Sequence, residues 1–496
     1  MGKFYITTAI AYANAKPHIG FALELLQADV LARWHGLKGD PRWFLTGTDE
    51  HGRKVAKAAE DAGKSEKVFV DEIASAFKRL TEALNISNDD FIRTSDQNVH
   101  WPGVIKLWKQ LEAAGDLYKD SYTGLYCAGC EEFKKPSDLI EGKCPNHGTE
   151  PEEIKEENWF FRLSKYGDAV KAKILSGDFR VIPEERQNEI ISFIDQGLED
   201  VSFSRPSKDL SWGIPVPDDP TQTMYVWADA LSNYITAIGY GRGGIHDSGS
   251  MFHDFWPADV HVVGKDITRF HAIIWPAMLL SAELPLPKQL LVHGFIQSSG
   301  KKMSKSLGNV IDPFDLIERY GIDPVRYYLL HEIPTTKDGD FTEERFREVY
   351  AGDLQKTIGN LLARVTKIGE GAAVEPKTST EVQEVIDAAW NRYNATFTGF
   401  ELNVALEEAV RLARFGNEFM EELKPWESDT AQEAAIPQLA LILHSVAWML
   451  TPFLPETAKK MFAQLGMDPG KQNGWEGTSV QMQKGDALFP RLSPDS

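Results

Sequence analysis

Cysteine is rare in this sequence. Three cysteines occur among 496 residues, and all of them lie between Cys127 and Cys144. Such a narrow distribution argues against a disulfide framework, because the rest of the chain offers no partner thiols. It indicates a compartment that keeps thiols reduced, and we expect a cytoplasmic protein.

Long apolar runs are also missing. The amino terminus carries a lysine but no uninterrupted apolar segment followed by a small-residue cleavage site, which argues against a secretory signal. The most apolar late stretch, Leu439 to Leu454, is interrupted by His444 and Ser445 and is shorter than the roughly 20 residues that a bilayer span needs. We therefore expect a buried helix there and no membrane partner.

Positive charge is in deficit. The chain has 53 Lys and Arg against 73 Asp and Glu, a net charge of -20. Phosphate contacts to nucleic acids come mainly from Lys and Arg, so any RNA contact must be local. What is present, 42% hydrophobic and 25% charged residues, is typical of a folded globular protein, and the length suits two to four domains.

The first hundred residues alternate strand and helix patterns. We predict a strand over Phe4 to Ile10, a helix over Ile19 to about Trp34, a strand over Arg42 to Thr46 and helices from Val55 to Leu84. This alternation predicts a parallel sheet with right-handed crossovers.

The alternation breaks where Gly, Cys, Pro and acidic residues cluster, and we expect an inserted module over about 115–225. Strand patterns resume at Met224 to Ala228, Val260 to Val263 and Gln289 to Phe295, as if the first sheet were being completed. From about 350 to 460, apolar residues recur at spacings of three and four, which predicts a helix bundle. The fold class is therefore α/β: a split Rossmann-type parallel sheet, an insertion and a C-terminal helical bundle.

Two short motifs indicate phosphate binding. His18 and Gly20 stand where a strand turns into a helix, the place where free backbone N–H groups favour phosphate, although a lone histidine there is more often a cap. Lys302 and Lys305, after the glycine of a Ser-Ser-Gly turn, can neutralise charge on a departing polyphosphate. Alone, that motif would be a solvated lysine loop; together the two indicate a nucleotide-binding enzyme.

The cysteines suggest a metal site. Two residues separate Cys127 from Cys130, and after thirteen further residues Cys144 and His147 repeat that spacing. Three thiolates and one imidazole occupy all four coordination positions of a tetrahedral zinc ion. No position is left open for water, so the metal would be structural. The alternative is that the thiols are buried by chance.

The segment from Pro17 to Phe21 and the segment from Lys302 to Ser306 resemble the two signatures of class I aminoacyl-tRNA synthetases. The second match is complete, whereas the first has Phe21 in place of its last histidine. A more specific resemblance, to methionyl-tRNA synthetases, spans nearly the whole chain. It is carried by the blocks Ala9–Asn14, Gly47–Gly52, Tyr225–Ala230 and Gly264–Ile267, with Phe270–His271.

This resemblance implies a role for particular residues. Catalysis would use His18, Lys302 and Lys305, and ATP would also contact Gly20, Gly264, Asp266 and Ser304. Asp49 would hold the substrate ammonium, with a side-chain pocket formed by Ala9, Ile10, Tyr12, Trp227, Ala230, Tyr234, Ile267 and His271. Asn360 and Arg364, one helical turn apart, and Trp426 would read the anticodon.

The resemblance also implies partners and an organisation. We expect methionine, ATP with magnesium, the initiator and elongator methionine tRNAs, and one structural zinc ion. The expected domains are 1–114 and 226–295 for the two catalytic halves, 115–225 for the insertion with its zinc knuckle, 296–350 for the lysine loop and stem-contact region, and 351–496 for the anticodon-binding helices. Because little sequence follows the helical region, we expect a monomer.

Two other functions stay open at this point. A nucleotidylyltransferase shares the histidine turn but needs neither the Cys₃His group nor a helical RNA-reading domain. A catalytically weakened tRNA-binding or regulatory homologue would account for Phe21. The length of the chain and the Cys₃His set count against the first, and methionine-dependent exchange of pyrophosphate into ATP would separate the second from a synthetase.

Overall fold

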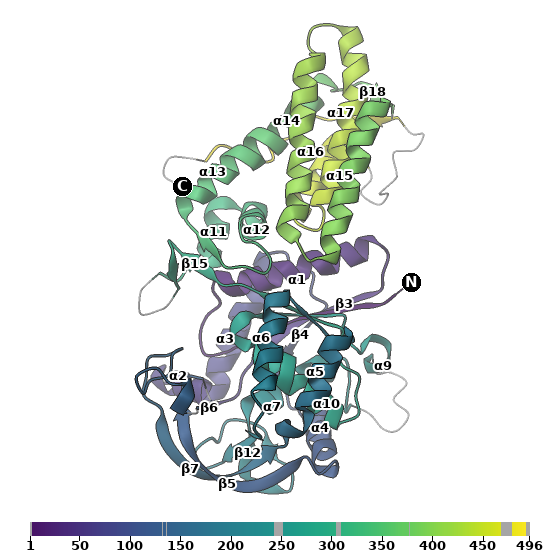
Figure 1. Cartoon of the computed structure of the whole chain (residues 1–496). Helices are drawn as coiled ribbons and strands as arrows, with labels where there is room; N and C mark the ends of the chain where they lie inside the picture. Colours follow the sequence, from purple (N-terminus) through teal and green to yellow (C-terminus); the bar gives the residue numbers. More distant parts are fainter. Residues whose placement is uncertain are drawn as a thin grey trace. The chain divides into compact units, whose positions relative to one another are not determined.

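The computed structural model describes residues 2–130, 132–134, 136–242, 251–303, 309–375, 377–467 and 479–492. The chain forms two compact units, each assembled from separate stretches of sequence (Figure 1). The first unit comprises Met1–Pro17, His35–Glu82 and Ser87–His293, and the second comprises His18–Trp34, Ala83–Ile86 and Gly294–Ser496.

The first unit is built on a seven-stranded parallel sheet of order β2-β3-β1-β13-β14-β8, with β4 paired to β3. Every residue of β1 is buried, because β1 pairs with β3 on one side and β13 on the other. Segments about 250 residues apart thus meet at one strand, which confirms the split sheet. The strands are β1 Phe4–Thr8, β2 Ala11–Tyr12, β3 Arg42–Asp49, β4 Asp90–Arg93, β8 Arg180–Ile182, β13 Val260–Gly264 and β14 Gln289–His293.

One predicted strand is wrong. The segment from Met224 to Ala228 does not join the parallel sheet: β12 (Asp219–Met224) ends there, in a small antiparallel sheet with β10 (Ser204–Pro206) and β11 (Pro215–Val216), and helix α7 (Val226–Ala230) follows. A short apolar run cannot by its period distinguish a strand from a buried helix. The sequence pattern also did not indicate β2, β4 and β8, which complete the sheet.

The core of the first unit packs helices against this sheet, with residues of α4, α8 and α10 beside residues of β1, β3, β13 and β14. The helices of this unit are α2 Arg53–Asp61, α3 Glu66–Ala83, α4 Trp101–Ala113, α5 Gly167–Ser176, α6 Glu184–Asp195, α7, α8 Asn233–Thr236, α9 Phe252–Phe255 and α10 Trp275–Ser281. A π-helical segment, Phe270–Ile274, leads into α10.

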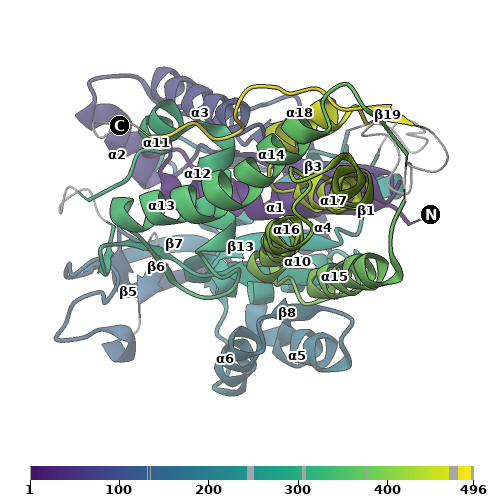
Figure 2. The ribbon, with the colours of Figure 1, turned by 90° about the horizontal axis from the view of Figure 1, so that it is seen from above.

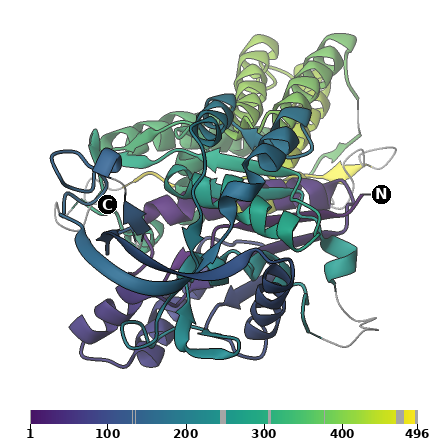
Figure 3. The ribbon, with the colours of Figure 1, turned by 60° about the horizontal axis from the view of Figure 1, so that its bottom comes forward.

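A second, antiparallel sheet of order β6-β5-β7-β9 lies in the same unit. Its long pair, β5 (Leu117–Cys127) and β7 (Glu152–Phe161), is continuous from Leu117↔Phe161 to Tyr126↔Glu152 and is visible as curved blue ribbons in Figure 3. The short strands are β6 (Glu132–Lys134) and β9 (Val201–Ser202). The cysteines lie at the far end of this pair: Cys127 is the last residue of β5, and Cys130 and Cys144 lie in the connection between β5 and β7.

The second unit is mainly helical. Its long helices α15, α16 and α17 pack side by side, and Figure 2 looks roughly along α16 and α17. Ser379 and Ser428 cap α15 and α17 by accepting hydrogen bonds from backbone N–H groups three residues later. The elements are α1 Ile19–Leu37, β15 Ile296–Ser298, β16 Lys301–Lys302, α11 Pro313–Tyr320, α12 Ile322–His331, β17 Gly339–Phe341, α13 Glu343–Val349, a π-helix Tyr350–Gly359, α14 Asn360–Ile368, β18 Ala373–Val374, α15 Thr380–Thr398, α16 Leu402–Leu423, α17 Asp429–Leu450, α18 Pro455–Leu465 and β19 Val480–Gln481.

Helix α17 contains most of the predicted apolar segment. Among the described residues it is the one helix long and apolar enough to cross a bilayer, yet 72% of its most apolar window is buried within the protein. It packs against α14, α15, α16 and α18. The buried helix expected over Leu439 to Leu454 is confirmed, although the helix ends at Leu450.

Helix α1 is fixed within the second unit by a buried arginine. Arg326 of α12 is fully buried, and its Nη2 donates to Asp29 Oδ2 of α1 at 2.7 Å. Its remaining donors reach the backbone carbonyls of Leu84, Pro452 and Phe453. A buried charge is tolerated only when its donors are satisfied, so this contact holds α1, whose first turn follows His18, in one position.

Candidate functional site

In the first unit, three of the predicted pocket side chains contact one another. Tyr234 and His271 are each 1% exposed, and the hydroxyl of Tyr234 lies 2.7 Å from His271 Nε2. His271 Nδ1 lies 2.9 Å from the carbonyl of Ile267, which can only accept, so Nδ1 carries the proton and Nε2 accepts from Tyr234. The edge of Trp227 meets the His271 ring at 6.0 Å and 87°.

This group is uncharged at neutral pH. Burial lowers the pKa of His271 from 6.5 to about 4. Trp227 also stacks on Phe270, with their ring centroids 3.9 Å apart. We call Trp227, Phe270 and His271 the aromatic wall. The arrangement offers polarizable rings, and its O–H and N–H protons are already donated to His271 and to Ile267. Such surroundings suit an uncharged, polarizable side chain.

Other predicted residues lie at the carboxyl edge of the parallel sheet. Ala9 follows β1, Asp49 ends β3 and Gly264 ends β13. Ligands of open parallel sheets bind at this edge. Asp49 is 6% exposed, is the register partner of Tyr12 in β2, and accepts a backbone bond from Ala13 at 2.8 Å.

Most of the remaining pocket residues lie in or against one core cluster. Ala230 is buried, Ala9 belongs to the core cluster that contains Tyr234, and Asp266 lies in the 3₁₀ turn that follows β13. The partly buried residues packed against that cluster include Ile10, Tyr12, Trp227 and Ile267. The structure therefore gathers the predicted methionine-pocket residues in one unit.

Beside this group is a buried polar network to which the sequence patterns gave no role. Asp229 lies between two histidines, with Oδ2 2.6 Å from His51 Nδ1 and Oδ1 2.7 Å from His100 Nε2. His51 and Asp229 belong to the blocks Gly47–Gly52 and Tyr225–Ala230, so the resemblance could have identified them as functional residues. No sequence signal pointed to His100.

His18 in the second unit caps helix α1. It is exposed, and its Nδ1 accepts a hydrogen bond from the Gly20 N–H at 3.1 Å. In the neutral imidazole the proton is then on Nε2, which becomes a donor. A Cβ on Gly20 would lie 2.9 Å from the His18 ring, so glycine permits this close approach. Phe21 is half-buried in the first turn.

The lysine motif is described in part. Lys302 lies in β16, and its backbone pairs with Gln297 of β15. Gly300 supplies the positive φ of the preceding turn, and its N–H donates to Asp340 at 2.9 Å. Ser304 and Lys305, both predicted to contact ATP, lie outside the described residues.

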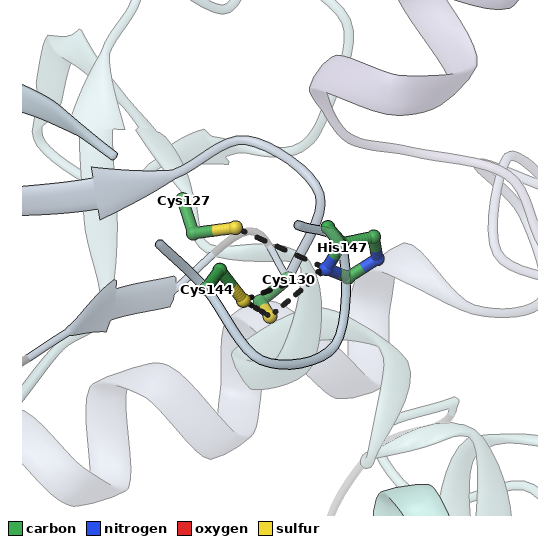
Figure 4. A group of neighbouring side chains, drawn as sticks. All are labelled: Cys127, Cys130, Cys144 and His147. Carbon is green, nitrogen blue, oxygen red and sulfur yellow. Dashed lines mark hydrogen bonds between the residues drawn. The ribbon is translucent and has the colours of Figure 1, made fainter. Parts of the chain in front are cut away.

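The four predicted metal ligands converge (Figure 4). Their ligand atoms all lie within 4.8 Å of one another. His147 Nδ1 is 3.4 Å from Cys130 Sγ, 3.7 Å from Cys144 Sγ and 3.9 Å from Cys127 Sγ. Tetrahedral zinc with sulfur ligands at about 2.3 Å requires separations of roughly 3.8 Å, so the group could hold a metal ion.

A glycine makes this approach possible. A Cβ on Gly129 would lie 2.5 Å from the His147 ring, so a side chain there would push the imidazole away. Cys127 and Cys144 are buried, Cys130 is partly exposed, and all three thiols are free of disulfides. The donor set and the geometry fit a closed structural site.

Two of the three predicted anticodon residues meet, Arg364 and Trp426. Asn360 and Arg364 lie in α14, and the Arg364 guanidinium lies 5.1 Å from the centre of the Trp426 ring. Arg364 Nη1 is held by Glu421 at 2.6 Å. Trp426 follows α16 and is 48% exposed, which is unusual for an indole and leaves a ring face for stacking.

Known proteins of one family match this chain over nearly its whole length. Residues 4–152 and 133–366 match the model of class I tRNA synthetases (M), and 368–488 match the anticodon binding domain of methionyl tRNA ligase. The methionine–tRNA ligase of Clostridium acetobutylicum is 42% identical over 99% of this chain and 79% of its own, and that of Brucella suis is 41% identical over 95% and 93%. Mycobacterium tuberculosis methionyl-tRNA synthetase, solved in complex with methionyl-adenylate, superposes with a TM-score of 0.92 at 37% identity, covering 99% of this chain and 100% of that one. The chain therefore belongs to the methionyl-tRNA synthetase family of class I aminoacyl-tRNA synthetases.

Proposed function

We propose that this protein activates methionine with ATP and transfers it to methionine tRNA. A carboxylate oxygen of methionine attacks the α-phosphorus of ATP, the bond to pyrophosphate breaks, and methionyl adenylate forms. The terminal ribose hydroxyl of the tRNA then attacks the activated carbonyl, and AMP leaves. No protein nucleophile is needed, so the side chains act by positioning the substrates and stabilising charge.

The buried Tyr234–His271 pair is the observation that carries the proposal. Because His271 is neutral and accepts from Tyr234, the pocket holds no charge for a cationic or anionic substrate side chain. It therefore favours a thioether over charged side chains of similar length. Asp49, at the carboxyl edge of the sheet, supplies the carboxylate for the substrate ammonium. The remaining pocket residues are Ala9, Ile10, Tyr12, Trp227, Ala230 and Ile267.

ATP would meet a different set of groups. The Nε2 proton of His18 would donate to its phosphates, and Lys302 and Lys305 would balance the charge on the departing pyrophosphate. Gly20 and Ser304 would approach the phosphates, and Gly264 and Asp266 the ribose. Magnesium would enter with ATP. Phe21 cannot donate a hydrogen bond, so His18 and the lysines would carry the phosphate contacts without it.

The tRNA would be read locally. Trp426 would stack on a splayed anticodon base, while Asn360 and Arg364 read its edge. We assign both initiator and elongator methionine tRNAs as substrates. A local contact of this kind is compatible with a net charge of -20.

The Cys₃His group would hold one zinc ion in a structural role, through Cys127, Cys130, Cys144 and His147. We propose catalytic halves over 1–114 and 226–295, a zinc-bearing insertion over 115–225, a lysine-loop and stem-contact region over 296–350 and an anticodon-binding region over 351–496. We further propose a cytoplasmic monomer, which size-exclusion chromatography with light scattering would test.

The decisive experiment is amino-acid-dependent exchange of pyrophosphate into ATP, run with each of the twenty amino acids. Methionine should support exchange well above the other nineteen. Charging of methionine tRNA should then follow in the same preparation. No exchange with methionine, or equal exchange with leucine or isoleucine, would overturn the proposal.

A further inference from the structure

Three titratable side chains form a buried chain within the first unit, and the proposed reaction uses none of them. Asp229 is 1% exposed, His51 3% and His100 is fully buried. The Asp229 carboxylate lies 2.6 Å from His51 Nδ1 and 2.7 Å from His100 Nε2. A fourth residue ends the chain, since Thr236 Oγ1 lies 2.7 Å from His100 Nδ1.

The direction of the hydrogen bonds follows from the carboxylate. Burial raises the pKa of the Asp229 carboxyl, but the two imidazoles outweigh this effect and hold that pKa below its ordinary value. An ionised carboxylate can only accept, so His51 Nδ1 and His100 Nε2 are both donors. The other ring nitrogen of His100, Nδ1, contacts Thr236 Oγ1 at 2.7 Å.

The chain connects two parts of the proposed amino-acid pocket. His51 stands two residues after Asp49, and Asp229 lies on α7 between Trp227 and Ala230. The hydrogen bond from His51 to Asp229 therefore links the segment that contains Asp49 to helix α7, which carries Trp227 of the aromatic wall.

The residue between Asp49 and His51 is anchored independently. Glu50 is fully buried, and its carboxylate accepts from Arg93 at 2.7 and 2.9 Å and from Thr48 at 2.6 Å. Its N–H donates to Thr94 at 2.8 Å. Glu50 fixes this segment to β4 and its end, whereas His51 alone among these contacts fixes it to α7.

We infer that Asp229 is a positioning residue of the amino-acid pocket, which sets the distance between Asp49 and the Trp227 wall through His51 and is itself oriented by His100. The inference rests on the proposed function, because it assigns Asp49 and Trp227 to methionine. Asp229 would not touch the substrate. Its removal should weaken methionine binding and leave ATP binding unchanged.

The first test is Asp229→Asn. One amide oxygen can still accept from one histidine, but the amide NH₂ then faces the N–H of the other, so one of the two bonds is lost. We expect the KM for methionine in pyrophosphate exchange to rise about tenfold, the value of one hydrogen bond to a charged group. The KM for ATP should stay within about twofold of the parent value.

The matched control is Asp116→Asn. Asp116 is also fully buried and accepts from Lys165 and Ser281 at 2.7 Å, but none of these residues belongs to the proposed pocket. It should lower the melting temperature without separating the two KM values. If both variants raise both KM values alike, Asp229 is merely structural and the inference fails.

The histidines allow a sharper test, which also decides the matter should Asp229→Asn not fold. Asparagine places its NH₂ near the position of Nδ1, and glutamine places its NH₂ near the position of Nε2. His51 donates through Nδ1, and asparagine can replace this donor. The methionine KM of His51→Gln should therefore be at least threefold higher than that of His51→Asn. His100 donates through Nε2, so the order should reverse there. The same order at both positions would overturn the inference.

The parent protein separates the two claims. If it catalyses no methionine-dependent exchange, the proposed function fails and the variants carry no information about the pocket. If it does and the histidine variants show no crossover, the proposed function stands and the positioning role of Asp229 fails.

Discussion

Trp426→Ala isolates the proposed anticodon contact from the rest of the protein. The indole is 48% exposed, so its removal takes little packing from the folded state. A base stacked on an aromatic ring contributes about 1–3 kcal/mol, which corresponds to roughly 5- to 160-fold in affinity. Arg364 loses its ring contact, worth about 0.5–1 kcal/mol at an exposed site. It keeps Glu421 at 2.6 Å, so its guanidinium stays in place.

We therefore expect kcat/KM for tRNA charging to fall about ten- to a hundredfold, while methionine-dependent pyrophosphate exchange stays within about twofold. Both rates are measured on the same preparation. Trp390→Ala is the control, because Trp390 is a partly buried indole of α15 that packs on Tyr393 and is not in the anticodon set. It should cost stability and leave charging intact. If exchange falls as much as charging in Trp426→Ala, the indole is structural and the reasoning is refuted.

Four further outcomes follow from the site. Asp49→Asn should weaken methionine binding by at least about thirtyfold, with ATP affinity unchanged, because a buried ammonium loses its charge partner; calorimetry with each ligand measures both. Elemental analysis should find one zinc per chain in the parent, prepared without chelators, and a strong loss in Cys144→Ser, whereas a metal-free parent would contradict the site. In single-turnover adenylate formation, His18→Ala should slow the step about a hundredfold and Phe21→His should change it by less than about tenfold, and the reverse ranking would refute the assignment. Burial lowers the pKa of His444 from 6.5 to about 4, so its contribution to stability is full above pH 6.5 and is lost as the pH falls toward 4. Between pH 7 and pH 5 this loss amounts to about 2 kcal/mol of unfolding free energy. Urea unfolding at the two pH values should therefore show a loss about 2 kcal/mol smaller in His444→Leu than in the parent, and equal losses would contradict the assignment.

The sequence predicted elements whose signals are local. Strands β1, β13 and β14 are apolar runs bounded by turn residues, and the long helices after residue 380 repeat apolar residues every three or four positions. The Cys₃His group was predicted from spacing alone, because its two pairs sit on short turns that bring each pair together.

Other features depend on contacts that no local pattern encodes. Strand β8 has three residues, too few to show a period, and it is recognisable only through its pairing with β14. His51 and Asp229 are 178 positions apart, and His100 and Asp229 are 129 apart, so only the folded chain brings them together. The pocket residues were assigned by resemblance, since single aromatic residues in an α/β protein are usually packing.

The central position of β1 has a consequence for how this protein is made. Ile6 pairs with Phe44 on one side and with Val260 on the other, so the second neighbour of the first strand is synthesised about 250 residues later. At translation speeds of about 5–20 residues per second, one edge of a strand that is fully buried in the folded protein stays unpaired for roughly ten to fifty seconds. An unpaired strand edge is a template for association with other chains. The nascent polypeptide should therefore depend on the ribosome surface or a chaperone to shield this edge until Val260 has emerged.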